Sequence, residues 1–176
     1  MVPDAYDKSP TGGVRGTRHR LRGPSRIDPV APASRPAAPA YKSVAAKKRV
    51  LFVCIGNSCR SQMAEAFARA YGGDIMEVQS AGVSPASIIA PLTKRTVGQW
   101  NLTIDDQFPK GLDHMRGEQF DVLINMSGVP VTLPGARSIT WTVADPIGQT
   151  EAFYRTVATQ IEGLVMRLIM ELRTAK

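Results

Sequence analysis

The sequence predicts an α/β fold in which a parallel sheet carries helices on both of its faces. From residue 48 onward, strand-like and helix-like segments alternate, and three of the strand-like segments are almost entirely apolar. Strands of a parallel sheet that is covered on both sides have this continuous apolar character. The chain has 176 residues, which is enough for one domain of ordinary size with a sizeable core.

The first strand is predicted at residues 49–53, R-V-L-F-V, a short apolar run that is followed closely by Gly56. Further strands are expected at 75–80, at 120–126 and, from a weaker pattern, at 137–141. Ligands of open parallel sheets bind at the carboxyl ends of the strands. Cys54 directly follows the first strand and therefore lies where a site is expected.

Four helical segments are predicted between and after these strands. They are residues 61–71, which end at a Gly-Gly pair, a segment that starts near Pro91, a short one within 112–120, and a long amphipathic one at 152–173. The long segment carries a regular apolar face formed by Phe153, Val157, Ile161, Leu164, Val165, Leu168, Ile169 and Leu172. This face is expected to pack on the core.

The beginning of the chain differs from the rest in composition. Residues 1–48 contain ten Lys and Arg against three Asp, whereas the remainder is neutral. Few large apolar residues and many prolines predict that residues 1–47 form a disordered extension before one domain at 48–176. Alternatively, the arginines at 15–22 dock on an acidic partner or a membrane surface. The neutral domain gives no reason to expect nucleic-acid binding.

Composition also limits the type of protein. Two cysteines are too few for a secreted disulfide scaffold, and the chain has no apolar run of 18 residues and no apolar segment near its start. A cytoplasmic protein without a membrane span is therefore expected. His19 and His114 are not placed near Cys54 and Cys59 in the sequence, so neither a metal nor another cofactor is expected.

The segment C-I-G-N-S-C-R-S at 54–61 joins the first strand to the next helix. Gly56 permits a tight turn or a positive φ, and Asn57 tolerates the left-handed region and can hydrogen-bond the loop to itself. The amides at the start of the helix, together with the Arg60 guanidinium, form a cradle suited to a tetrahedral oxyanion. The same positive field favours a thiolate at Cys54. These residues predict a nucleophilic cysteine beneath a bound oxyanion, although a lone cysteine after a strand is more often a core residue.

This loop resembles the C-x-G-N-x-C-R-S signature of the low-molecular-weight protein tyrosine phosphatases and of the thioredoxin-coupled arsenate reductases that share their fold. The resemblance runs from about Arg49 to Arg173, and it includes S-A-G at 80–82, D-V-L-I at 121–124 and A-D-P at 144–146. It implies a flavodoxin-like, four-stranded parallel sheet. It also implies that phosphate or arsenate binds in a loop made of Ile55, Gly56, Asn57, Ser58, Cys59, Arg60 and Ser61.

The resemblance further implies individual roles. Cys54 would be the nucleophile, Arg60 would bind the phosphate and Asp145 would be the general acid; Ser61 would stabilise the thiolate, and Asn57 and Ser80 would brace the loop. A proton donor is needed to expel an alkoxide or phenoxide, and a carboxyl in a partly desolvated mouth can supply it. Taken alone, D-P-I-G around Asp145 is also a good turn sequence. Ile55, Trp100 and Ile147 are candidate walls of the pocket, although ordinary packing at a helix end explains Trp100 at least as well.

Three functions are compatible with these residues. The first is hydrolysis of a phosphorylated protein or small phosphomonoester through a cysteinyl-phosphate. The second is arsenate reduction, because S-Q-M-A-E at 61–65 and W-T-V-A-D-P at 141–146 are more like the reductases. The third is oxyanion binding without turnover.

Arsenate reduction requires a relay of thiols, and the reductases carry two more cysteines just after the third strand. Here that region has Met126 and Val129 at the expected positions, and neither side chain can exchange disulfides. Hydrolysis is therefore expected ahead of reduction. Cys59 remains as the redox partner of Cys54. Ile147 replaces an aromatic residue that phosphatases often carry, which argues against a strong phosphotyrosine preference.

Overall fold

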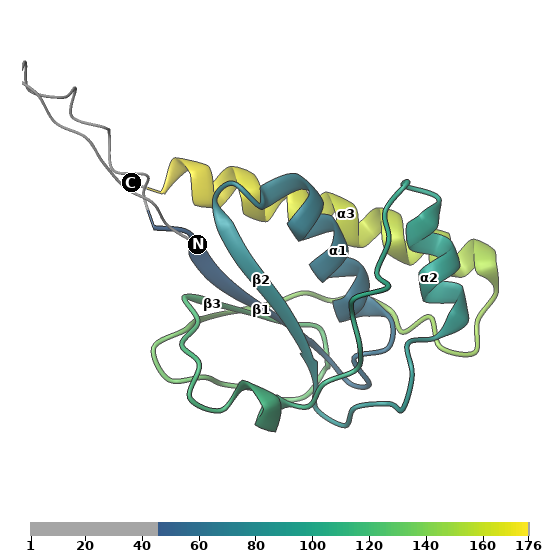
Figure 1. Ribbon diagram of the computed structural model, residues 1–176, viewed down its shortest axis with the longest axis horizontal. Helices are drawn as coiled ribbons and strands as arrows, with labels where there is room; N and C mark the ends of the chain where they lie inside the picture. The colour runs from purple at the N-terminus through teal and green to yellow at the C-terminus, as the bar shows by residue number, and fades with distance from the viewer. Residues whose placement is uncertain (1–45, 176) are drawn as a thin grey trace, which may run out of the picture. The chain divides into compact units, whose positions relative to one another are not determined.

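A computed structural model of the protein describes residues 46–175 (Figure 1). Four parallel strands form one sheet in the order β2-β1-β3-β4, namely β1 (Lys48–Cys54), β2 (Met76–Gly82), β3 (Val122–Asn125) and β4 (Arg137–Thr140). The predicted four-stranded parallel sheet of flavodoxin-like order is confirmed. Residues 1–45 lie outside the described residues, so the disordered extension and its boundary near residue 47 stay predictions.

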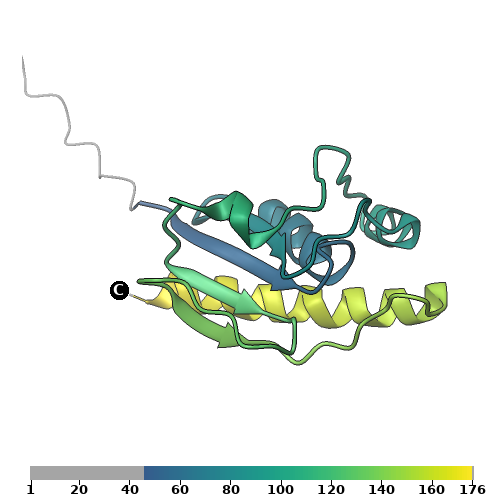
Figure 2. The ribbon, with the colours of Figure 1, turned by 90° about the horizontal axis from the view of Figure 1, so that it is seen from below.

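The helices begin and end close to the predicted residues. They are α1 (Arg60–Gly72), α2 (Pro91–Gly98) and α3 (Glu151–Thr174), and α2 starts at the predicted proline. The short helix expected within 112–120 is a single 3-10 turn, η1 (Leu112–Met115). In Figure 2, α3 runs along the length of the sheet.

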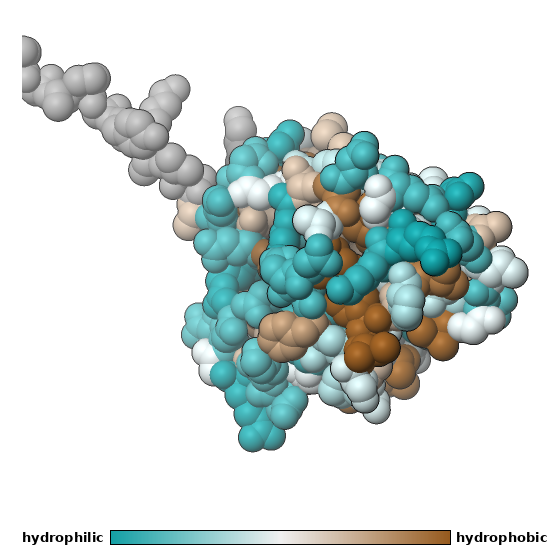
Figure 3. Space-filling view, turned by 45° about the vertical axis from the view of Figure 1, so that its right-hand side comes forward, coloured by the Kyte–Doolittle hydropathy of each residue, from teal (hydrophilic) through white to brown (hydrophobic). Residues whose placement is uncertain are grey.

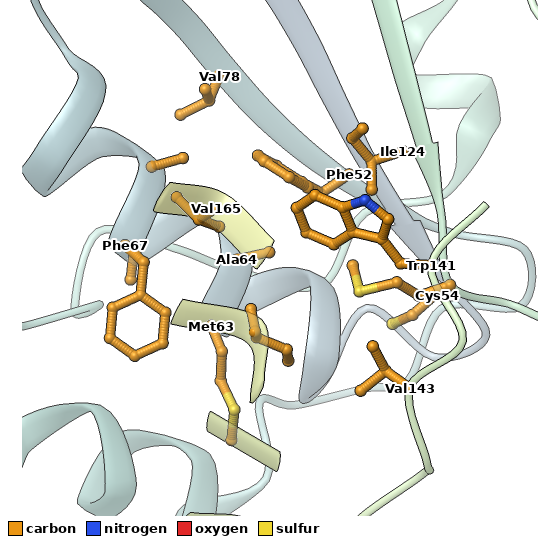
Figure 4. Close-up of a cluster of buried hydrophobic side chains, with 14 of the residues drawn as sticks. Phe52, Cys54, Met63, Ala64, Phe67, Val78, Ile124, Trp141, Val143 and Val165 are labelled. Carbon is orange, nitrogen blue, oxygen red and sulfur yellow. The ribbon is translucent and has the colours of Figure 1, made fainter. Parts of the chain in front are cut away.

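The sheet separates two apolar clusters, because successive residues of a strand point to opposite faces. On one face, Val50, Phe52 and Cys54 of β1 pack with residues of α1 and α3 (Figure 4). On the other face, Leu51 and Val53 pack with residues that include Met115 and Phe120. All three α-helices contribute to the first cluster, whereas the second is covered by η1 and loops. The covering of the second face is thus thinner than the expected layer of helices, because the chain between β3 and β4 forms no helix.

The sheet brings the end of β1 next to the end of β2, where Cys54 pairs with Gly82. A Cβ atom at Gly82 would lie 2.7 Å from the main-chain oxygen of Ile55 and 2.9 Å from the nitrogen of Asn57. Only glycine therefore lets β2 pass so close to the loop after β1. Among residues 46–175, no helix is long and apolar enough to cross a membrane.

Candidate active site

The loop between β1 and α1 is shaped by Asn57, whose φ of 45° lies in the left-handed region. Gly56, which could adopt a positive φ without strain, does not have one. Asn57 is fully buried, and its side chain is bonded on all sides. The side-chain partners are Ser61 Oγ at 2.8 Å and Ser80 Oγ at 2.8 Å, which accept from Nδ2, and the Lys110 amide at 2.7 Å and Gln62 Nε2 at 3.1 Å, which donate to Oδ1. These bonds hold the backbone in a conformation that a side chain otherwise disfavours.

The Cys54 thiol lies at the base of this loop and is buried, with its Sγ atom 3.0 Å from Ser61 Oγ. Because Asn57 Nδ2 donates to the Ser61 hydroxyl, the hydroxyl keeps its own proton free to donate to sulfur. A donated hydrogen bond stabilises the thiolate, which is the nucleophilic form of cysteine. The geometry thus suits the expected role of Ser61.

The main-chain amides of residues 56–60 donate no hydrogen bond to any group within the part of the chain that the structure describes. Unpaired amides at so buried a place are uncommon in folded proteins. Four of these five residues line a cavity of about 20 Å³, whose full lining is Cys54, Gly56, Ser58, Cys59, Arg60, Asp145 and Ile147. Free amides at a helix start beside a guanidinium are the donors that a tetrahedral oxyanion needs.

Arg60 connects the loop to the ends of β3 and β4. Its Nη1 atom donates to the carbonyls of Met126 at 2.9 Å and Val143 at 3.1 Å, and Nη2 lies 2.5 Å from Asp145 Oδ2. The Arg60 side chain is 7% exposed and that of Asp145 is 46% exposed. Asp145 Oδ1 also accepts from the amide of Ile147 at 3.1 Å. The structure therefore brings Asp145, from the chain after β4, next to the loop that carries Cys54 and Arg60.

A buried polar network beneath the loop was not expected from the sequence. Gln62 Nε2 donates to the carbonyls of Asn57 at 2.9 Å and Phe108 at 3.1 Å. The fully buried Glu65 accepts from Ser80 Oγ at 2.5 Å, forms an ion pair with Arg69 and lies 3.9 Å from Lys110 Nζ. Gln62 and Glu65 lie off the apolar face predicted for 61–71. The feature of the sequence that could have indicated their burial is their position in the first turns of the helix, directly after the loop.

Cys59 is also buried, and its Sγ atom lies 3.4 Å from the Tyr154 hydroxyl of α3. Burial raises the pKa of the Cys59 thiol, an effect that contacts with Thr93, Tyr154 and Ser58 offset only in part. Burial likewise raises the pKa of Tyr154. Both cysteines are free thiols and both line the small cavity. In residues 46–175, no group of three or more His, Cys, Asp and Glu could hold a metal ion.

Of the three candidate wall residues, Ile147 lines the cavity and is half exposed, and Ile55 lies in the loop itself. Of the two interpretations of Trp100, the structure shows packing at a helix end. Its ring packs edge-on against Phe67 of α1, with 5.4 Å between centroids, and belongs to the apolar cluster rather than to the mouth. A tryptophan at a helix end packs where apolar area is available, and here that is the groove beside α1.

Comparisons with known proteins agree with this arrangement. The family model described as low molecular weight phosphotyrosine protein phosphatase matches residues 49–176. The glutaredoxin arsenate reductase of Synechocystis is 34% identical over 131 residues, which cover 71% of this chain and 98% of that protein. An arsenate reductase solved in a phosphate-binding state has a TM-score of 0.65 at 32% identity, covering 71% of this chain and 98% of that one.

A phosphatase is found among the similar structures as well. The low molecular weight protein tyrosine phosphatase from T. tengcongensis has a TM-score of 0.61 at 27% identity, covering 71% of this chain and 99% of that one. The similar proteins thus include both activities on one fold, with arsenate reductases prominent among them. With its family model matched from Arg49 to the end and with its loop in the corresponding place, the chain belongs to the low molecular weight phosphotyrosine protein phosphatase family.

Proposed function

We propose that the protein is a cysteine-dependent hydrolase of phosphomonoesters that acts through a cysteinyl-phosphate on Cys54. The observation that carries this proposal is the buried Cys54 thiol at the base of a loop whose amides at residues 56–60 have no partner among residues 46–175, with the Ser61 hydroxyl at 3.0 Å from the sulfur. The amides and Arg60 would hold the phosphoryl oxygens while the sulfur attacks phosphorus from below.

In the first step, the bond from Cys54 sulfur to phosphorus forms and the ester bond from phosphorus to oxygen breaks. The leaving oxygen takes a proton from Asp145, which lies at the open side of the cavity. In the second step, Asp145 accepts a proton from a water molecule that attacks phosphorus, and the thiolate of Cys54 leaves. Phosphate is then released and the free enzyme is regenerated, and neither sulfur nor phosphorus changes its oxidation state.

The pair between Arg60 and Asp145 gives this cycle an order of events. In the free protein the carboxylate occupies one arm of the guanidinium, 2.5 Å from Nη2. A bound phosphoryl group would compete for the same arm, because a guanidinium binds oxyanions with that edge. Asp145, released by this exchange, would take up a proton from solvent and be free to turn towards the leaving oxygen as the acid of the first step. The two carbonyls at Nη1 keep Arg60 in place meanwhile.

Arsenate reduction is the second candidate, and the names of the similar proteins favour it over hydrolysis. Reduction of arsenate to arsenite takes two electrons from two thiols, which end as a disulfide. Cys54 would form the bond to arsenic, and a second thiol would then attack the Cys54 sulfur and release arsenite. That second thiol must be Cys59 or a thiol of an external reductant.

The structure around the third strand supports hydrolysis over reduction. The turn after β3 is held by the side chain of Asn125. Its Oδ1 atom accepts from the Ser127 hydroxyl at 2.7 Å, and its Nδ2 atom donates to the carbonyl of Val129 at 2.7 Å. No residue of this turn has a thiol. Cys59 is buried against Tyr154, and its raised pKa keeps it in the less reactive thiol form.

One pair of assays distinguishes the two candidates. The purified protein is given an aryl phosphate, and separately arsenate with a complete thioredoxin or glutaredoxin system, and Cys54→Ser serves as the blank in both. Release of phosphate without arsenite supports hydrolysis. Arsenite formation that depends on the added reductant, without phosphate release, would replace the proposal by the reductase. Binding of phosphate with neither product would leave an oxyanion-binding module.

A further inference from the structure

Large apolar side chains are exposed on the surface around the loop. Within the described residues, six of the eight exposed large apolar side chains lie on loops at the carboxyl edge of the sheet, and the other two lie on α3. The six are Ile55, Val83, Ile88, Phe108, Val129 and Ile147. Figure 3 shows hydrophobic side chains gathered between hydrophilic areas on the side of the molecule that includes α2. Gathered exposure of this kind marks a binding surface more often than scattered single residues do.

Two of these side chains line one groove beside the loop. Ile88 is 66% exposed and Phe108 is 53% exposed. The groove has a volume of about 440 Å³, and its walls include Ile88, Ile89, Pro91, Lys94, Phe108 and Pro109. That volume lies within the range of roughly 300–1,000 Å³ that is usual for ligand sites. The cavity above Cys54, at about 20 Å³, encloses far less.

Both walls of the groove are tied to the loop by hydrogen bonds. On one side, the Ser58 hydroxyl donates to the carbonyl of Ile88 at 3.1 Å and accepts from the amide of Ala90 at 3.0 Å. On the other side, Gln62 Nε2 bonds the carbonyl of Phe108 at 3.1 Å. The groove therefore keeps a fixed position relative to the oxyanion cradle. A substrate held by its phosphoryl group would present its neighbouring atoms to this groove.

The positive charge at the edge of the groove indicates which kind of ligand could bind there. Lys94 is the charged residue in its lining, and the nearest carboxylate, Asp105 at 3.5 Å, is 82% exposed and binds it weakly. An apolar floor with a weakly paired cation at its rim suits a polypeptide that carries a large apolar residue and an acidic group. It suits a small, fully polar phosphomonoester poorly.

We infer that the groove between Ile88 and Phe108 binds a large apolar side chain of a phosphorylated polypeptide, close in sequence to the phosphorylated residue. The inference rests on the proposed phosphatase function and adds a substrate class to it. Phosphopeptides with leucine at the favoured position are hydrolysed with a higher kcat/KM than the same peptides with alanine. The expected advantage is on the order of tenfold, as for other changes of a few methylene groups in an apolar site.

The test uses a set of phosphotyrosine peptides. Each peptide carries one leucine, placed in turn at one of the three positions before or the three positions after the phosphotyrosine. A peptide with alanine at all of these positions and a free aryl phosphate serve as references. The variants are Ile88→Ser and Phe108→Ser, whose side chains are exposed, and the matched control is Met170→Ser on α3, which is 60% exposed and lies outside the groove. Each groove variant is expected to reduce the leucine advantage to about threefold or less. Neither should change the rate on the free aryl phosphate, and the control should change nothing.

The two proposals fail in different ways. Hydrolysis of the free aryl phosphate together with equal rates on all peptides overturns the groove and leaves the phosphatase standing. No hydrolysis of any phosphate overturns the phosphatase. Peptide binding to Cys54→Ser, measured by calorimetry, then still tests the groove, because leucine and alanine peptides that bind equally well overturn it. Loss of a dimer in the groove variants, seen by ultracentrifugation, would assign the surface to a second copy of the chain and also overturn the inference.

Discussion

The Asp145 carboxylate accepts a hydrogen bond from Arg60 Nη2 at 2.5 Å, so the expected general acid is joined directly to the expected phosphate-binding residue. The Arg60 side chain is almost fully buried, whereas Asp145 is nearly half exposed. The exposed partner of the pair is the one that is free to move. An incoming oxyanion and Asp145 therefore compete for one arm of a fixed guanidinium.

The first prediction follows from this competition. In Asp145→Asn, turnover of an alkyl phosphate is expected to fall by about 10²–10⁴, because the leaving oxygen loses its proton donor. Turnover of an activated aryl phosphate, which needs no proton, should fall much less. Inorganic phosphate should inhibit the variant more strongly, by on the order of two- to fivefold in Ki, because an exposed competing charge has been removed. Steady-state kinetics with both substrates and with phosphate measure all three effects. Equal loss on both substrates would assign Asp145 to the scaffold.

The second prediction concerns the nucleophile. Cys54→Ser should abolish turnover because a serine hydroxyl is not ionised at neutral pH. Phosphate binding should persist, since the amides of residues 56–60 and Arg60 are untouched. Calorimetry with phosphate and a trapped-intermediate assay with labelled substrate give the two readouts. More than a few per cent of the wild-type rate in the serine variant would rule out Cys54 as the nucleophile.

The third prediction separates charge from geometry at Arg60. Arg60→Lys keeps the charge but loses the planar fork, in which one nitrogen donates to two main-chain carbonyls while another faces the oxyanion. The rate should fall strongly, and the melting temperature should fall as well, because the carbonyls of Met126 and Val143 lose their donor. The control is Arg155→Lys, an exposed arginine of α3 that bonds Gln99. If Arg60→Lys retains the full rate, Arg60 does not bind the oxyanion.

How much of this site the sequence could predict depends on the kind of residue. Cys54 and Arg60 were indicated by the loop at 54–61 and Asp145 by the family resemblance, and the structure places the three residues around one cavity. Gln62 and Glu65 were not indicated, because a polar residue on the predicted solvent side of a helix gives no sign that a loop will bury it. Tyr154 was likewise absent from the apolar face predicted for α3, although it is buried against Cys59.

In the fold, too, some features could be predicted from the sequence and others could not. Buried strands and a long amphipathic helix follow from local periodicity, and all four strands and α3 begin and end within two residues of their predicted positions. The segment 112–120 forms only the η1 turn. Its extent could not be predicted, because the length and apolar content of so short a segment do not determine how much of it is helical. The left-handed φ falls on Asn57 rather than Gly56, because four side-chain hydrogen bonds outweigh the intrinsic preference for glycine.

The fourth prediction tests the network beneath the loop. Gln62→Met preserves the approximate volume but removes the donor for the carbonyls of Asn57 and Phe108. Leaving buried acceptors unpaired costs about 1–3 kcal/mol, so the melting temperature should drop by several degrees. The KM for an aryl phosphate should rise as the loop loosens. Gln160→Met is the matched control, since this exposed glutamine also donates to a main-chain carbonyl, that of Thr142. Equal effects of both variants would show that Gln62 does not position the loop.

The last prediction concerns the two thiols. Because burial raises the pKa of Cys59, this residue stays a neutral thiol at neutral pH, and iodoacetamide should alkylate Cys54 first. Labelling of Cys59 should begin only as the pH rises towards its raised pKa, and peptide mass spectrometry across a pH series follows both sites. Preferential labelling of Cys59 at neutral pH would show that its thiol is not protected by burial beside Tyr154.

Peroxide should oxidise Cys54 to a sulfenic acid, and Cys59, which lines the same cavity, should condense with it to a disulfide and release water. Inactivation of the wild type is then reversed by dithiothreitol. Cys59→Ser should keep most of its activity but lose this recovery, because nothing intercepts further oxidation to the sulfinic acid. Tyr154→Phe, which removes a 3.4 Å contact that lowers the pKa of the Cys59 thiol, should form the disulfide more slowly. Full recovery of Cys59→Ser would show that Cys59 only packs beneath the loop, whereas loss of an arsenate activity in the same variant would make Cys59 the second thiol of a reductase.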